Sequence, residues 1–167
     1  IASVRQSYLQ LLFKLLGLPM LPNYIDGQVK FKTKLDRRNE LVFIGLAGFD
    51  NMKLSDSPDD AGDEYLLSYL PKLKQETFTV GMSYRHFGDG NQQTYSLSYS
   101  YLNNRNIKYI DNDESTEENV ILESSGLEGK AQGRFENRSY LDAWTVREGA
   151  EVYYRHYDTD VYRRMAG

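Results

Sequence analysis

The chain of 167 residues carries 24 acidic and 20 basic side chains, which gives a formal net charge of −4. Without a basic excess it has little charge to neutralise phosphates, and this argues against a nucleic-acid-binding protein. The absence of cysteine excludes disulfide frameworks, thiolate metal sites and cysteine nucleophiles.

The beginning of the chain predicts the end of a strand over Ile1–Arg5, followed by an apolar run over Tyr8–Leu21. Glycine and proline interrupt this run, so it is too short and too broken to span a membrane as a helix. Leucine and phenylalanine side chains recur in it at helical spacing, which leaves a short amphipathic helix open. We favour the other interpretation, a loop that packs on the end of a sheet.

Six further strands are expected from alternation of polar and apolar residues. The alternation is clearest in QTYSLSYSYL, residues 93–102, where threonine and serines occupy one face and tyrosines and leucine the other. Gly88-Asp89-Gly90-Asn91 signals a hairpin turn immediately before it. The strands expected are Gln28–Leu35, Glu40–Asp50, Thr77–Phe87, Gln93–Leu102, Leu127–Asn137 and Trp144–Tyr157.

The lengths of the connections favour a membrane barrel over a soluble sandwich. In a sandwich the aromatic face would form the core, whereas in a barrel it would face lipid and the hydroxyl face would line a wet lumen. The connections after the second, fourth and sixth strands are short, and those after the first, third and fifth are long. Outer-membrane barrels alternate tight periplasmic turns with long extracellular loops in this way.

Two stretches of the chain then carry a family resemblance: VRQSYLQLL, at residues 4–12, and YIDGQVKFKTKLDRRNELVFIGLAGFDNM, at residues 24–52. They resemble the barrel of TonB-dependent outer-membrane receptors of the bacteroidete type. The shared features are Arg5-x-Ser7-Tyr8-Leu9, then Tyr24-x-Asp26 opening a strand with Lys30, and later Leu41 leading into Gly45, Gly48 and Asp50. Segments such as LSYSYLNNRN and REGAEVYYRHYDT have the same aromatic-rich alternation.

The resemblance implies a barrel of about 22 strands, filled by an N-terminal plug, that imports nutrients with energy passed from TonB. Seven strands are too few for that barrel, and we find neither a plug nor a TonB-contacting segment. We therefore expect residues 1–167 to be an all-β antiparallel meander, a single segment of a receptor barrel in the outer membrane of a Gram-negative cell. Its expected partners are membrane lipid, a small nutrient or glycan substrate, and the TonB complex through missing parts of the parent chain.

A row of lysines on the second strand is the first candidate for contact with substrate. Lys30, Lys32 and Lys34 share one face and could attract anionic solutes or the plug from the lumen. The alternative is a solvated strand face that balances acidic neighbours.

The acidic segment DNDESTEEN supplies the second candidate. Asp111, Asp113 and Ser115 stand at the first ligand spacings of a calcium loop. Thr116 replaces the required glycine, however, and Leu122 replaces the bidentate glutamate. We therefore expect no metal and no cofactor. The acidic segment SDSPDDAGDE, residues 55–64, is interpreted in the same way as a solvated loop.

Aromatic residues beside the short turns are candidates for a membrane interface. Tyr84 and Phe87 flank one turn, and Tyr140 and Trp144 flank another. In a barrel they would form an interfacial girdle, and in a soluble domain they would cap a core.

Nothing in the sequence predicts an enzyme. The two histidines lack partners at metal-ligand spacing, no Gly-x-Ser-x-Gly motif occurs, and no phosphate-binding loop is present. The function expected is passive passage of a nutrient along a barrel wall. The alternative is a soluble or periplasmic all-β domain that binds a partner through its edges or long loops.

Overall fold

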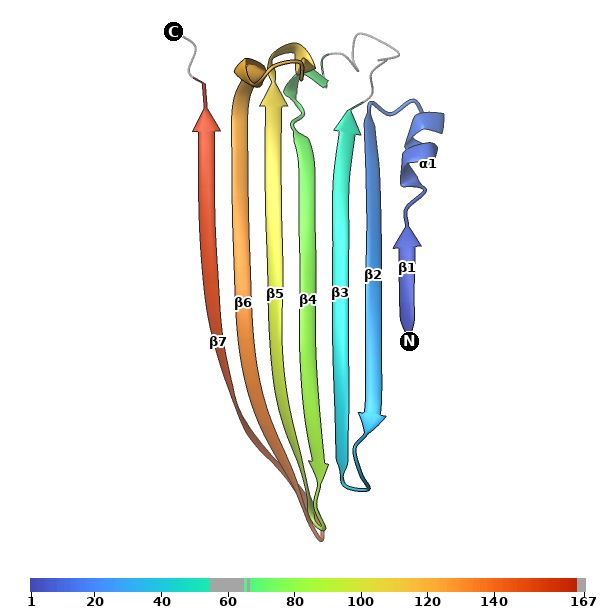
Figure 1. The fold of residues 1–167 in the computed structure, drawn as a ribbon, viewed down its shortest axis with the longest axis vertical. Helices are drawn as coiled ribbons and strands as arrows, with labels where there is room; N and C mark the ends of the chain where they lie inside the picture. The colour runs from blue at the N-terminus through green and yellow to red at the C-terminus, as the bar shows by residue number, and fades with distance from the viewer. Residues whose placement is uncertain (55–64, 66, 165–167) are drawn as a thin grey trace.

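The computed structural model describes residues 1–54, 65 and 67–164, and these form one antiparallel sheet of seven strands. Each strand pairs with its neighbour in the chain, in the order β1-β2-β3-β4-β5-β6-β7 (Figure 1). The predicted all-β antiparallel meander is thereby confirmed. The strands are β1 (Ala2–Gln6), β2 (Met20–Lys34), β3 (Asn39–Leu54), β4 (Lys72–Phe87), β5 (Asn91–Tyr109), β6 (Val120–Leu141) and β7 (Trp144–Arg163).

Most strands extend further than the sequence predicts. β2 begins at Met20 and not at Gln28, although Pro22 lies within it. Proline is tolerated there because β1 pairs only with Ile25–Val29, so β2 is an edge strand at the height of Pro22 and its missing N–H breaks no ladder bond. The six long strands contain 15 to 22 residues, well beyond the roughly 3–10 residues usual in globular proteins.

The apolar run near the start of the chain forms a helix, so the loop that we favoured there is wrong. Helix α1 spans Leu9–Leu15 and packs beside the upper end of β2 (Figure 1). The hydroxyl of Ser7 accepts a hydrogen bond from the backbone N–H of Leu9 at 3.0 Å, which satisfies one amide at its beginning. The leucines of this segment also favour the helix, because leucine has a high helix propensity. Within the described residues, no helix has the length and apolar character needed to cross a membrane.

The connections sort by length between the two ends of the sheet. The short ones, residues 35–38, 88–90 and 142–143, lie at the lower end in Figure 1. The long ones span residues 7–19, 55–71 and 110–119, and residues 7–19, 67–71 and 110–119 lie at the upper end. Two short 3₁₀ turns, η1 (Ile110–Asn112) and η2 (Glu117–Asn119), occupy the last of them. The predicted alternation of short and long connections is confirmed.

The sheet is a single layer without a core between layers. Among the described residues, the only buried apolar side chains are Pro19, Leu54 and Leu67, and no side chain there is completely buried. β7 is exposed along its whole length. Toward the lower end, β5, β6 and β7 curve toward β4 (Figure 1). Both faces of the sheet are therefore open along most of their area.

Candidate functional site: the two faces of the sheet

The strand register determines which side chains share a face. One row across the sheet joins Phe31, Phe43, Met82, Leu97, Gly133 and Val152. The adjacent row on the opposite face joins Lys32, Val42, Ser83, Ser96, Arg134 and Glu151. We name the first the apolar face and the second the polar face. The two faces predicted from residues 93–102 are confirmed, with tyrosines on the apolar face and serines on the polar face.

The apolar face carries a band without charged side chains. Its four consecutive rows pass through Leu41, Phe43, Gly45 and Ala47 of β3 and cross from β2 to β7. None of these rows contains Asp, Glu, Lys or Arg. At about 3.3 Å per residue the band spans about 20 Å along the strands. The band is also exposed; Leu97, for example, keeps 62% of its surface accessible.

Polar residues border this band on the side of the short turns. Tyr84 donates its hydroxyl hydrogen to the side-chain oxygen of Asn39 at 2.6 Å, and His86 Nδ1 lies 2.8 Å from the same oxygen. Tyr95 donates to the side chain of Gln93 at 3.3 Å. These rings thus lie on the apolar band with their hydroxyls directed toward the polar border, the arrangement that tyrosine adopts at an apolar–polar boundary.

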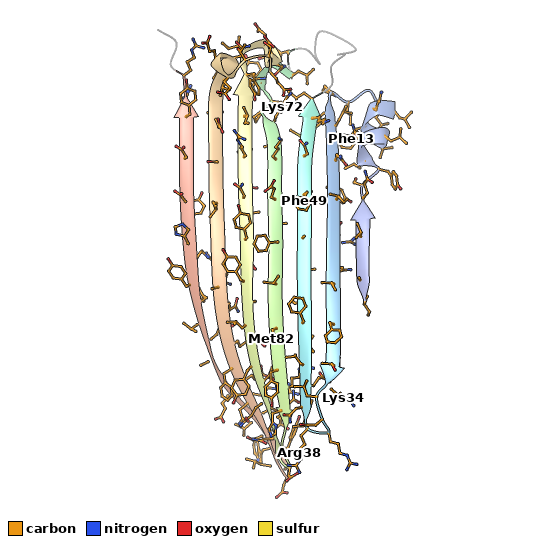
Figure 2. All side chains as sticks on the ribbon, viewed as in Figure 1. Phe13, Lys34, Arg38, Phe49, Lys72 and Met82 are labelled. Atoms are coloured by element: carbon orange, nitrogen blue, oxygen red, sulfur yellow. The ribbon has the colours of Figure 1, made fainter. Side chains whose placement is uncertain are left out.

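The other border of the band lies below the long connections. The row through Asn51 contains Lys74, Arg105, Ser125 and Asp160. In Figure 2, Met82 of the apolar band lies in the middle part of the sheet, and Lys72, which the register also places on the apolar face, lies near its upper end. The apolar face is therefore polar at both ends and apolar between them.

The polar face at the height of the band is lined by hydroxyl groups on β4 and β5. Ser96 donates a hydrogen bond to Ser83 at 3.1 Å, and Thr79 donates to Ser100 at 3.0 Å. These cross-strand pairs are part-buried by their neighbours. The strand whose pattern was clearest in sequence thus has one face suited to water and one suited to an apolar environment.

The lysine row lies on the polar face and is partly neutralised there. Lys32 Nζ lies 2.7 Å from Glu40 Oε2, and Arg85 Nη1 lies 3.1 Å from Glu40 Oε1. Glu40 is only 5% exposed because these two cations and its neighbours cover it. Lys30 and Lys34 form no ion pair with another described residue. Within the row, Lys32 is thus balanced by an acidic neighbour, whereas Lys30 and Lys34 lie outside the ion pairs of the described residues.

Further ion pairs on the polar face were not predicted from sequence. Arg134 pairs with Glu136 at 2.8 Å, and Arg155 pairs with Glu128 at 3.2 Å. The second pair joins β6 to β7, so it depends on the register between them, which no local signal in the sequence fixes. The face that would line a lumen thus mixes both signs of charge with hydroxyls.

The acidic candidates lie far from the lysines, at the end with long connections. Asp113 accepts hydrogen bonds from the backbone N–H and the hydroxyl of Ser115, at 2.9 and 3.0 Å, and from the side chain of Asn119 at 2.9 Å. The backbone bond from Ser115 contributes most to lowering the pKa of Asp113, and the other two act in the same direction. Asp111 adopts a left-handed backbone conformation with φ of 50°. Asp113 thus holds its own loop together, and the two acidic residues do not join the lysines in one site.

One buried ammonium in this region gave no signal in the sequence. Lys108 is 7% exposed, and its Nζ donates to the carbonyls of Leu67 and Leu70 at 2.8 and 3.1 Å. It also donates to the side chain of Asn112 at 2.5 Å. Because its donors are used internally, Lys108 joins the connection before β4 to the connection after β5.

The four predicted interface aromatics do not lie on one face. Strand alternation and pairing place Tyr84 and Trp144 on the apolar face, and Phe87 and Tyr140 on the polar face. Ring contacts instead join Tyr84 to Tyr95, with centroids 6.2 Å apart, and Tyr95 to Phe135, at 5.0 Å. If the strand ends had been known from the sequence, the alternation of side chains would have assigned the four residues to two different faces.

Side chains of the metal-ligating types do not cluster among the described residues. These residues contain no group of three or more His, Asp or Glu side chains able to hold a metal ion. Glu148 and Glu151 face opposite sides of β7. The segment SDSPDDAGDE lies outside the described residues.

Comparison with models of known protein families and with curated proteins finds no match for this chain.

Proposed function

We propose that this chain forms part of the wall of a transmembrane β-barrel, in a TonB-dependent outer-membrane receptor that takes up a nutrient. Its apolar face lies against lipid and its polar face lines the lumen. The long connections face the cell exterior, and the short turns face the periplasm. The chain performs no chemistry on the substrate.

The observation that carries this proposal is the exposed apolar band with polar borders at both ends. Burial of a large apolar side chain is worth about 1.5–3 kcal/mol, so a face with many exposed ones needs an apolar cover. A band of about 20 Å approaches the roughly 25 Å of the lipid-facing surface of outer-membrane barrels. Tyrosines with hydroxyls directed to one border fit the aromatic girdle of such barrels.

The polar face and the unpaired edges give further support. Hydroxyls and mixed charges suit a water-filled or plug-filled lumen. β7, and β2 outside Ile25–Val29, have no partner strand on their outer side among the described residues. Open edges of this length favour aggregation, and additional strands of the same barrel would remove them. The proposal thus requires the missing parts of a parent receptor, through which the TonB complex would act.

Fractionation of the source cell tests the proposal. Membrane and soluble fractions are separated and analysed by gel electrophoresis with and without boiling, with an antibody against this chain. We expect a band in the outer membrane, several-fold larger than 19.3 kDa, whose mobility changes on boiling. A soluble band near 19.3 kDa would overturn the proposal and favour the soluble or periplasmic binding domain.

A further inference from the structure

A groove of about 470 Å³ lies on the polar face, close to the long connections. One row of its lining runs across four strands and consists of Tyr24, Asp50, Gln75 and Asn104. The register places these side chains next to one another, on the same face as the hydroxyl rows of β4 and β5. The groove therefore belongs to the surface that we assign to the lumen.

The next row completes the lining with a different chemistry. It consists of Pro22, Met52, Leu73 and Asn106. Three of these side chains are apolar, and Asn106 lies beside Asn104 on the same face of β5. The groove thus offers an apolar strip parallel to a row of amides, with the tyrosine ring at the β2 end.

The amides of the groove are available to a ligand. Gln75, Asn104 and Asn106 form no side-chain hydrogen bond to another described residue. Each amide carries two donor hydrogens and one acceptor oxygen, and each sugar hydroxyl is likewise donor and acceptor. The apolar strip and the tyrosine ring suit the C–H surface of a sugar ring, since tyrosine combines an apolar ring with a polar hydroxyl.

The charge of the groove disfavours ionic ligands. Its two rows contain one carboxylate, that of Asp50, and no lysine or arginine. Lys74 contributes to the lining from the neighbouring position, but alternation directs its side chain to the opposite face. Arg5, in the adjoining row of the polar face, is engaged with Asp26 at 2.8 Å. An anion would find no free cation in these rows, and a divalent cation would find a single carboxylate.

We propose that this groove binds a neutral, hydroxyl-rich ligand, an oligosaccharide in chemical class. The inference deepens the proposed function, on which it rests, by naming a class of substrate and a binding position near the outer mouth of the lumen.

The test compares two aspartate substitutions on adjacent residues. Asn104→Asp removes the donors of one groove amide at nearly constant shape. Asn103→Asp makes the same change on the opposite face of β5, outside the groove, and is the matched control. Gln75→Glu is a second groove variant. Protein purified in mild detergent from source cells carrying each variant is applied to an array of neutral, acidic and aminated oligosaccharides.

We expect neutral oligosaccharides to bind the unmodified protein, and binding to weaken about tenfold or more in Asn104→Asp and Gln75→Glu, because a hydrogen bond in the groove is lost. Asn103→Asp should bind as the unmodified protein does. The inference is overturned if no neutral oligosaccharide binds, or if the groove variants bind as tightly as the control. Cell fractionation separates the two proposals: protein in the outer membrane without groove-dependent binding contradicts only this inference. Groove-dependent binding by a soluble protein contradicts the receptor and the position in a lumen, but not the ligand class of the groove.

Discussion

The two faces of the sheet are built from the same strands, but one carries apolar side chains and the other carries polar and charged ones. At the height of the apolar band, Leu97 projects from one face of β5 and Ser98 from the other. The apolar face lacks any charged residue over four rows, whereas the polar face at that height carries lysine, arginine and glutamate. Because the sheet has no second layer to form a core, we infer that its stability depends on what covers the apolar face.

The largest expected effect comes from a charge placed in the band. Leu97→Arg should destabilise the protein in phospholipid vesicles by about 2–4 kcal/mol, because the guanidinium would lie near the middle of the lipid layer. Ser98→Arg, one residue further on the same strand, should change stability by no more than about 0.5 kcal/mol. Urea unfolding in vesicles measures both. Equal losses, or a larger loss for Ser98→Arg, would contradict the assignment of the faces.

A close backbone approach should make one position on the polar face intolerant as well. A Cβ atom at Gly149 would lie 2.5 Å from the backbone oxygen of Phe135, on the neighbouring strand. Gly149→Ala should therefore force the strands apart and destabilise the protein by about 1–3 kcal/mol in the same unfolding measurement. Gly90→Ala is the matched control, since a Cβ there would meet nothing within 4 Å. A neutral Gly149→Ala would show that β6 and β7 are less close than the structure has them.

A smaller effect is expected from the ion pairs of the polar face. Glu40→Gln removes the carboxylate between Lys32 and Arg85, and should destabilise less than Leu97→Arg does because both cations are substantially exposed. The loss should shrink in about 1 M salt, where charges are screened over roughly 3 Å. Glu128→Gln, which removes a more exposed pair with Arg155, should cost less than Glu40→Gln. A Glu40→Gln loss that salt leaves unchanged would mean that packing and not charge holds this cluster.

The smallest effect concerns the turn between β2 and β3. The carboxylate of Asp36 accepts a hydrogen bond from the side chain of Asn39 at 2.6 Å and another from the backbone N–H of Arg38 at 2.7 Å. Both bonds lower the pKa of Asp36, and the bond from Asn39 contributes most. Because folding lowers the pKa of Asp36, its ionised carboxylate stabilises the turn at any pH above the pKa that Asp36 has in the unfolded chain. This stabilisation is lost as the pH falls through the pKa of Asp36 in the folded protein. The Arg38 amide signal in an NMR titration should therefore shift with a midpoint below the ordinary aspartate value. Asn39→Ala should move the midpoint upward; an unchanged midpoint would refute the role of Asn39.

The sequence predicts the fold where a strand has two chemically different faces. Residues 93–102 alternate between hydroxyl and large apolar side chains, so the strand and its two faces follow directly. The remainder of β5, Asn103–Tyr109, carries polar residues on both faces, and alternation gives no sign that the strand continues. Pro22 likewise indicated a break, because proline is compatible with a strand only where its edge is unpaired.

The parts of the candidate site that join several strands could not be predicted. Glu40 meets Lys32 and Arg85 only because β2, β3 and β4 pair in one register, and a shift by one residue would move Glu40 to the other face. The groove through Tyr24, Asp50, Gln75 and Asn104 needs four strands in register. The lysine row was predicted because its residues alternate within a single strand.

The most direct test of the account is the environment of the two faces at one height. Because the chain has no cysteine, nitroxide labels can be attached singly at Leu97→Cys and Ser98→Cys, in protein held in the source membrane. Electron paramagnetic resonance then measures collisions with oxygen, which enriches in lipid, and with a water-soluble nickel complex. We predict that the label at position 97 collides often with oxygen and rarely with the nickel complex. The label at position 98 should collide with the nickel complex more often than the label at position 97 does. A label at position 97 shielded from both reagents would mean that protein covers the apolar face, and would contradict the membrane barrel.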